Sequence, residues 1–266
     1  MGAALHLFDR QIRQSLVPPQ PGFVVERVGK VVRCTAPDGR SWGCFVEWSD
    51  LDEETVDAAI AEQVAHFGGR GATFEWKTYG YDQPADLTQR LLRAGFVAED
   101  EETLVLGEVD QVVAGAAAVV VPSAVVLRHA TDADWDGIAA LNTAVWGGDH
   151  RRLVDDIASE VASQPDQIRV HVAEADDQIV SAAWVRFHDG TSFASLWGGS
   201  TLVPWRRRGI YRALVGRRAA EAEQRGFRYL QVDTSPDSRP ILERLGLHAV
   251  ASTTPYVWSP PTDASR

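Results

Sequence analysis

The segment that decides the fold is STLVPWRRRGIYRALVGRR, which spans residues 200–218. Three consecutive arginines precede Gly209, and apolar residues then recur at helical spacing, at Leu214, Val215, Ala219 and Ala222. The pattern predicts a strand that ends near Pro204, followed by a helix over 208–225. It concentrates positive charge in a chain that is acidic overall, with 26 Lys and Arg against 37 Asp and Glu.

This strand-to-helix junction has the properties of an anion-binding site. The first N–H groups of a helix lack internal acceptors and lie at the positive end of the helix dipole. Gly209 has no Cβ, so we expect a ligand to approach the backbone there. Four arginines add full charges that suit a phosphate, namely Arg206, Arg207, Arg208 and Arg212. A solvated basic helix is the alternative interpretation.

The bulk composition limits the possible functions. A net charge of −11 argues against broad nucleic-acid binding, although salt-dependent binding by the arginine cluster stays open as a third hypothesis. Cys34 and Cys44 lie in apolar, strand-like runs, which favours reduced, buried thiols in a cytoplasmic protein. We expect no signal peptide, because residues 1–14 have no basic start and no long apolar core. We expect no membrane span, because the most apolar stretch, residues 112–127, is too short and is interrupted by Pro122.

An internal repeat indicates the domain organisation. At a constant offset of 151 residues, YGYD (79–82) aligns with LQVD (230–233), and RAGF (93–96) aligns with RLGL (244–247). TLVL (103–106) aligns with TPYV (254–257) at the same offset. Three matches in register, half a chain apart, predict two copies of one domain.

Both copies predict helices scattered among strands. The fold class is therefore α+β, a mixed α/β sheet in which each of two tandem domains has a mostly antiparallel sheet flanked by helices. Expected helices cover 3–16, 53–67, 85–94, 131–147, 151–163, 208–225 and 237–245. Expected strands cover 22–28, 30–36, 43–48, 73–81, 103–108, 168–174, 178–187, 192–202, 227–233 and 248–258. The expected domains are 1–111 and 127–266, joined by a linker over 112–126.

Only the second copy has the anion-binding junction. The corresponding helix start in the first copy, within residues 47–60, contains no glycine and gathers acidic side chains, namely Asp50, Asp52, Glu53, Glu54 and Asp57. Acidic residues offset the dipole of the helix that they begin, but they repel a phosphate. We therefore expect one polyanion site in each chain, in the second copy.

The sequence resembles the GCN5-related N-acetyltransferase family from residue 127 to about 260. That family's cofactor motif is Arg or Gln, two residues, Gly, one residue, then Gly or Ala, and it corresponds here to residues 206–211. Tyr211 replaces the last small residue of the motif. Residues 229–247 resemble the next strand and helix of the family, with Leu247 where Phe is usual. The first half matches only as a degenerate copy without the cofactor motif.

The resemblance implies that acetyl-CoA is the acyl donor. Its diphosphate would lie on the amides of residues 207–212, and its pantetheine arm would pair with the edge of the preceding strand, where the strands splay apart. The implied cofactor-binding residues are Thr201, Leu202, Arg206, Arg207, Arg208, Gly209, Ile210, Tyr211 and Arg212.

The usual catalytic groups of the family are missing. Members often carry a Glu on the strand before the motif, but residues 195–200 contain no carboxylate. Many also carry a Tyr four residues before the terminal glycine, where this chain has Leu242. The substitute candidates are Asp233, Ser235 and Tyr256. Attack by an already neutral amine would need no dedicated base.

Each candidate also has a purely structural interpretation. Asp82 occupies the place of Asp233 in the first copy, which favours a cap, and Tyr256 suits a core or rim position. His150 is interpreted as a surface-loop residue. Three tryptophans could line a substrate pocket or fill the core, namely Trp146, Trp184 and Trp197. The histidines show no metal-ligand spacing, so we predict no metal.

These observations predict an acetyl-CoA-dependent N-acetyltransferase that acts on the primary amine of a small molecule. The expected partner is that amine, with no nucleic acid or membrane, and the chain is expected to be a monomer or a homodimer. The alternative is a non-catalytic acyl-CoA-binding or interaction module, which the missing Glu and Tyr favour.

Overall fold

A computed structural model describes residues 2–37 and 43–261, and these residues form two compact units. The N-terminal unit comprises Gly2–Leu104 together with the chain from Val250 onward, and the C-terminal unit comprises Val105–Ala249. The described strands belong to one 12-stranded mixed sheet, and each unit has its own run of neighbouring strands and its own hydrophobic core. In the described part of the chain, no helix combines the length and apolar character that crossing a bilayer requires.

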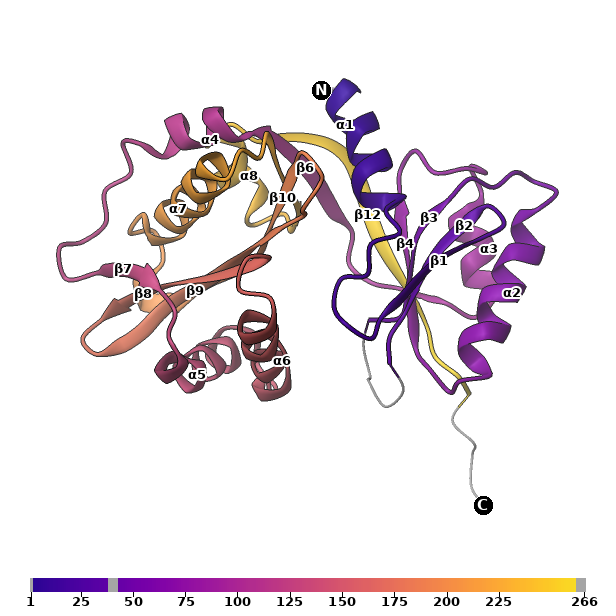
Figure 1. Ribbon diagram of the computed structural model, residues 1–266, viewed down its shortest axis with the longest axis horizontal. Coiled ribbons are helices and arrows are strands. Elements are labelled where there is room, and N and C mark those ends of the chain that lie inside the picture. The colour runs from indigo at the N-terminus through magenta and orange to yellow at the C-terminus, as the bar shows by residue number, and fades with distance from the viewer. Residues whose placement is uncertain (1, 38–42, 262–266) are drawn as a thin grey trace, which may run out of the picture. The chain divides into compact units, whose positions relative to one another are not determined.

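The N-terminal unit is a sheet in the order β1-β2-β3-β4-β12, with β5 paired to β12. Strands β3 and β4 are parallel, whereas β1–β2, β2–β3 and β4–β12 are antiparallel. Helices α2 and α3 cover one face, and α1 lies on the other (Figure 1). The elements are α1 (Gly2–Phe8), the π-helix η1 (Asp9–Arg13), β1 (Val24–Val28), β2 (Val31–Thr35), β3 (Phe45–Ser49), α2 (Val56–Gly68), β4 (Phe74–Tyr79), α3 (Leu87–Arg93), β5 (Val97–Ala98) and β12 (His248–Trp258).

The C-terminal unit is a sheet in the order β6-β11-β10-β9-β8-β7. Strands β10 and β11 are parallel, and β7 to β10 are antiparallel in succession. Helices α5 and α6 lie on one side of β7–β9, and α4 and α7 lie on the other (Figure 1). The elements are β6 (Glu102–Glu108), α4 (Val109–Ala116), β7 (Val126–His129), the 3₁₀ turn η2 (Asp132–Asp134), α5 (Trp135–Trp146), α6 (Arg151–Ser163), β8 (Ile168–Ala175), β9 (Gln178–Phe187), β10 (Phe193–Thr201), the 3₁₀ turn η3 (Val203–Trp205), α7 (Ile210–Gln224), β11 (Tyr229–Thr234) and α8 (Arg239–Glu243).

The two units confirm the expected fold class. Each contains a run of antiparallel strands, a helix, a strand parallel to the last of that run, and a second helix. The glycines expected to end the second helices, Gly95 and Gly246, have φ values of 92° and 99°. Only glycine adopts this left-handed conformation cheaply, which explains why the helices stop there. Cys34 and Cys44 are buried, free thiols, also as predicted.

The last strand of each copy belongs to the other unit. Residues 250–258 of β12, at the end of the chain, lie in the N-terminal unit, where Thr253–Trp258 pair with Phe74–Tyr79 of β4. Residues 105–108 of β6 lie in the C-terminal unit, where β6 neighbours β11. The units therefore differ from the expected division into 1–111 and 127–266, because the repeat identifies equivalent residues but not the copy with which they pair.

The expected linker also differs from the structure. Residues 109–116 form α4, whose Val109 and Val112 are buried in the core of the C-terminal unit. A Cβ at Gly216 of α7 would lie 2.5 Å from the Cβ of Ala116, so α4 packs closely on α7. The first part of the apolar run that suggested a connector, residues 112–116, is instead the end of a short helix whose buried face packs in the core.

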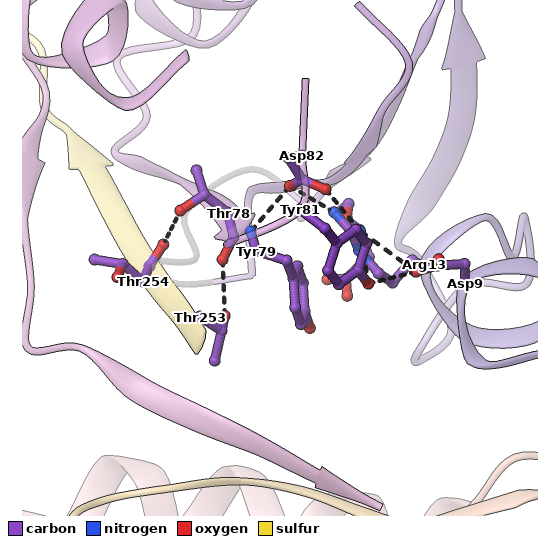
Figure 2. A network of polar contacts seen from close by, with 9 residues as sticks. Asp9, Arg13, Thr78, Tyr79, Tyr81, Asp82, Thr253 and Thr254 are labelled. Carbon is purple, nitrogen blue, oxygen red and sulfur yellow. Dashed lines mark hydrogen bonds and ion pairs between the residues drawn. The ribbon is translucent and has the colours of Figure 1, made fainter. Parts of the chain in front are cut away.

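A buried arginine organises the centre of the N-terminal unit (Figure 2). Arg13, from η1, is fully buried and forms two hydrogen bonds of 2.9 Å with the two carboxylate oxygens of Asp82. Its Nε donates to the carbonyl oxygen of Glu47 in β3 at 3.1 Å. The guanidinium carbon lies 4.0 Å from the ring centroid of Tyr79 and 4.7 Å from that of Trp48. Arg13 thus joins the first helical segment to β3 and to the turn after β4.

We expect Arg13→Met to destabilise the N-terminal unit by about 3–5 kcal/mol, because it leaves the buried Asp82 carboxylate without its partner. Urea unfolding followed by tryptophan fluorescence measures this loss. Arg10→Met, at an exposed position of the same helical segment, is the control. The double variant Arg13→Met/Asp82→Leu should recover much of the stability, since it removes both charges together. A loss no larger than that of the Arg10 control would contradict the assigned role.

Candidate functional site

The candidate site of the C-terminal unit begins where two parallel strands part. Strand β10 pairs with β11 only through Phe193–Tyr229, Ala194–Leu230 and Ser195–Gln231. Beyond Ser195, β10 continues to Thr201 against β9 alone, so its other edge is not paired with β11. The resemblance to the N-acetyltransferase family implied that these strands are apart near Thr201 and Leu202, and β10 and β11 have separated before those residues.

Two glycines in β10 accommodate aromatic rings at a β-bulge. The register between β10 and β9 shifts between Trp197 and Ser200, and Gly198 has a φ of 63°. A Cβ at Gly198 would lie 1.8 Å from the ring of Trp184, and one at Gly199 would lie 2.4 Å from the ring of Tyr211. Tyr211, which replaces a small residue of the family motif, therefore packs against the bulge.

The loop that enters α7 presents backbone donors. Arg207 and Gly209 have φ values of 63° and 82°, so two residues near the helix start are left-handed. In the part of the chain that the structure describes, the N–H groups of residues 207–212 have no hydrogen-bond acceptor. Successive N–H groups in such a conformation form a concavity that binds anions. The side chains of Arg206, Arg207, Arg208 and Arg212 around this loop are exposed.

The reason for the glycine at position 209 differs from the expected one. A Cβ there would lie 2.5 Å from the carbonyl oxygen of Val120, in the segment between α4 and β7. The chain itself, not a ligand, occupies the space beside the Gly209 Cα. The positive φ and this close approach both require glycine, so a substitution at 209 would disturb the loop whether or not a ligand binds.

The pantetheine arm was expected to pair near Thr201 and Leu202, but the backbone groups of these residues have partners within the chain. The amide of Leu202 donates to the carbonyl oxygen of Val180 in β9 at 2.9 Å. The carbonyl oxygen of Thr201 accepts a hydrogen bond from the Nε of Arg206 at 3.0 Å. These groups are already used, so a ligand would pair with β10 earlier in the strand, within residues 196–200, where the carbonyl oxygens of Trp197 and Ser200 also have donors, Arg218 and Ser181.

The three tryptophans lie around this edge but differ in exposure. Trp184 is buried, which makes it a core residue, whereas Trp146 is 65% exposed and Trp197 is 45% exposed. The indole of Trp146 donates to the Ser200 hydroxyl at 2.8 Å, and the hydroxyl donates to Asn142 at 2.8 Å. Trp146, at the end of α5, is therefore fixed beside the bulge of β10.

The catalytic candidates are not all brought to the site. Asp233 lies in β11 and Ser235 in the exposed turn that follows it, so both belong to the C-terminal unit. Tyr256 is buried in the core of the N-terminal unit, where it pairs with Trp76, so its role is packing. Leu242, at the place of the usual tyrosine, is fully buried. His150 is at the N-terminus of α6 and bonds to the carbonyl oxygen of Gly147 at 2.7 Å.

Sequence analysis missed a polar chain at the point where β10 and β11 part. The indole of Trp197 donates to the Ser195 hydroxyl at 2.7 Å, and this oxygen lies 2.8 Å from Nε2 of His188. Burial lowers the pKa of His188 to about 4, so its imidazole is neutral at pH 7 and its Nε2 can accept a hydrogen bond from the hydroxyl group. These two hydrogen bonds fix the orientation of the Trp197 ring. No spacing in the sequence indicated this contact, because the pattern around His188 predicts a hairpin turn.

Sequence analysis also missed a cluster that joins α7 to β7 and β8. Ligand-type atoms of His129, His171 and Glu221 lie within 4.8 Å of one another, a grouping that could hold a metal ion. The Glu221 carboxylate already pairs with Arg225 at 2.8 Å and with Arg169 at 3.3 Å. These two cations satisfy its charge, so we interpret the cluster as an ion-pair network, and the absence of a metal stays a prediction.

No family model matches the sequence, and no curated protein does. Solved structures match over nearly the whole chain. A GCN5-related N-acetyltransferase from Kribbella flavida is 14% identical, with 98% of this chain and 96% of that chain covered and a TM-score of 0.66. A tandem GNAT protein from the clavulanic acid biosynthesis pathway is 13% identical, covering 93% of this chain and 86% of its own, with a TM-score of 0.60.

A GNAT-family protein described as a putative acetyltransferase, from Novosphingobium aromaticivorans DSM 12444, is 17% identical and covers 97% of this chain and 100% of its own, with a TM-score of 0.58. At these identities the likeness shows the fold alone. The chain has the fold of the GCN5-related N-acetyltransferases, consistent with the tandem form that the repeat predicts.

The Glu221 network predicts loss of stability in acid. Burial opposes ionisation of Glu221, but hydrogen bonds and charges from His171 and Arg225 outweigh it and lower its pKa to about 2. Because the folded pKa lies below the unfolded value of about 4.3, this stabilisation is complete above that pH and is lost as the pH falls toward 2. Burial also lowers the pKa of His171, whose protonation below about pH 6.5 favours unfolding in the same direction.

We expect Glu221→Gln to lower the free energy of unfolding at pH 7 by about 1–2 kcal/mol, less than the full linkage value because the carboxylate keeps some solvent contact. The variant should also lose part of the acid sensitivity between about pH 5 and 3. Denaturant unfolding at several pH values measures both effects. Glu223→Gln, an exposed position on the same helix, is the control. A pH profile for Glu221→Gln parallel to that of the wild type would refute the network.

Proposed function

We propose that the protein is an acyl-CoA-dependent N-acyltransferase that transfers an acetyl or related short acyl group to the primary amine of a small molecule. The observation that carries the proposal is the loop at residues 207–212, whose N–H groups lack acceptors in the described part of the chain. It opens onto the unpaired edge of β10, in a fold shared with known acetyltransferases.

The loop suits the diphosphate of a CoA thioester. Free N–H groups at the start of α7 would donate hydrogen bonds to its oxygens, and the exposed arginines would offset its charge. The edge of β10 over residues 196–200 would then pair with the amide groups of the pantetheine arm. A CoA thioester supplies an activated acyl group, and the chain's contribution is to hold it beside the amine.

In the described part of the N-terminal unit, both features are closed by the chain's own residues. In the loop before α2, the Asp52 carboxylate accepts hydrogen bonds from the amides of Glu54 and Thr55, at 3.2 and 2.9 Å. Where β3 and β4 part, the side chain of Arg13 lies against Glu47 of β3. We therefore propose one CoA site in each chain, in the C-terminal unit.

Transfer requires a neutral amine, a stabilised oxyanion and a proton for the leaving thiolate. No carboxylate lies in residues 195–200, so we propose direct attack by an amine that is already neutral, with proximity supplying much of the acceleration. Trp146 and Trp197 are exposed beside the β10 bulge and form the proposed wall of the amine site. The second candidate function is acyl-CoA binding without turnover, which the absence of a carboxylate favours.

Calorimetric titration with CoA should give one site per chain. Arg212→Glu, in the first turn of α7, should weaken binding roughly tenfold or more, because it replaces a cation near the diphosphate with an anion. Arg217→Glu, farther along the same helix with its side chain on the carbonyl oxygen of Leu127, should change the affinity about twofold at most. Two sites per chain would contradict the assignment of the N-terminal unit, and no binding would refute the site.

Turnover separates the two functions. The protein is mixed with acetyl-CoA and a panel of primary amines, and the release of free thiol is followed. Thiol release that depends on the amine supports the transferase. Saturable CoA binding with no amine-dependent release across the panel would favour the binding module instead.

A further inference from the structure

A second fully buried arginine lies in the C-terminal unit. Arg218 of α7 is 1% exposed, and its Nε donates to the carbonyl oxygen of Leu214 at 3.0 Å. Its Nη1 donates to the carbonyl oxygens of Trp184 and Trp197, at 3.1 and 3.2 Å. All three acceptors are neutral backbone groups, so the hydrogen bonds orient the guanidinium but do not neutralise its charge.

The other terminal nitrogen of Arg218 has no partner. Its Nη2 is buried and makes no hydrogen bond, and no carboxylate among the described residues pairs with the side chain. Burial lowers the pKa of Arg218 to about 10, so the group still carries its charge at pH 7. A buried charge without a counter-ion is strongly destabilising, which indicates that an anion is missing from its surroundings.

The position of Arg218 connects it with the proposed donor site. Strands β10 and β11 are last paired at Ser195 and Gln231, and the carbonyl group that Arg218 binds belongs to Trp197, two residues farther along β10. The guanidinium therefore bridges β9 and β10 at the β-bulge, just beyond the last β10–β11 pair. A donor held by its diphosphate at the start of α7 would extend its acyl end toward this point.

The N-terminal unit provides an internal comparison. Its parallel pair, β3 and β4, ends at Val46 and Trp76, and Arg13 donates to the carbonyl oxygen of the next residue of β3, Glu47. There the chain supplies the counter-ion, because Asp82 binds the guanidinium through both oxygens. In both units a buried arginine marks the point where the strands part, and only Arg218 lacks a carboxylate.

We propose that Arg218 binds, through its Nη2, a carboxylate carried by the acyl group, so that the preferred donor is a short ω-carboxyacyl-CoA such as a succinyl or malonyl thioester. This inference rests on the proposed function and specifies its acyl donor. Arg218 would then select the donor by pairing with the end of the acyl chain, while the thioester carbonyl stays accessible to the amine.

The test compares acyl groups of matched length on the full-length wild-type protein. Succinyl-CoA and butyryl-CoA differ mainly in a carboxylate that replaces a methyl group, and malonyl-CoA and propionyl-CoA form a second pair. Calorimetric titration should give a dissociation constant roughly tenfold or more lower for the carboxylated member of at least one pair, as expected for a charge-assisted hydrogen bond. Equal or weaker binding of both carboxylated donors, with CoA itself bound, would overturn the inference and leave the proposed function intact.

A variant locates the selectivity. Arg218→Met should abolish the preference for the carboxylated donor, so that succinyl-CoA and butyryl-CoA bind within about twofold of each other, whereas Arg217→Met should keep the preference. Thermal unfolding establishes that both variants are folded. If Arg218→Met does not fold, Arg218→Lys takes its place, because it keeps the charge but loses the forked geometry. Retention of the full preference in a folded Arg218→Met protein would also overturn the inference, whereas failure of all CoA thioesters to bind would refute the proposed function itself.

Discussion

The candidate site depends on a parallel strand pair that ends after three residues. Beyond Ser195 and Gln231, β10 is paired only with β9, and its bulge is held open by glycines that make room for the rings of Trp184 and Tyr211. A strand edge that is not covered exposes polar groups that must be satisfied by a partner. The free amides at the start of α7 follow the same strand, so one local separation supplies both an edge and an anion-binding loop.

Buried arginines show how the two copies have diverged. In the N-terminal unit, the charge of Arg13 is matched by Asp82, aromatic rings surround it, and the helix start after β3 is capped by Asp52. In the C-terminal unit, the charge of Arg218 and the amides of residues 207–212 lack such partners in the described chain. In the N-terminal unit, side chains of the protein itself satisfy these polar groups. In the described part of the C-terminal unit, the corresponding N–H groups and the Arg218 guanidinium keep unsatisfied donors.

Much of the fold could be predicted from local signals. Residues 178–187 and 248–258 were predicted as strands with the bounds that β9 and β12 have, and Gly95 and Gly246 marked the helix ends. The bounds follow from periodicity and turn residues, which are local properties of the chain. The resemblance gave the family fold, and the motif gave the loop before α7.

The sequence-based predictions that the structure corrects concern contacts between residues that are far apart in the sequence. The sequence could not indicate that Val120 lies against Gly209, or that Tyr256 packs in the N-terminal unit, because both depend on chain segments far away in sequence. Arg13 and Arg218 resemble ordinary surface charges in a helical pattern, and only burial distinguishes them. The cross-pairing of the repeats was hidden for the same reason, since equivalent residues in two copies are interchangeable in an alignment.

The position of β12 also has a consequence for synthesis of the protein. The N-terminal unit includes residues 250–258, which leave the ribosome after the whole of Val105–Ala249. Domains usually fold in order of their emergence, beginning with the first. Here the strands of the first unit are complete only after Val105–Ala249 have been synthesised, and a truncation before residue 250 would damage the half of the molecule made earliest.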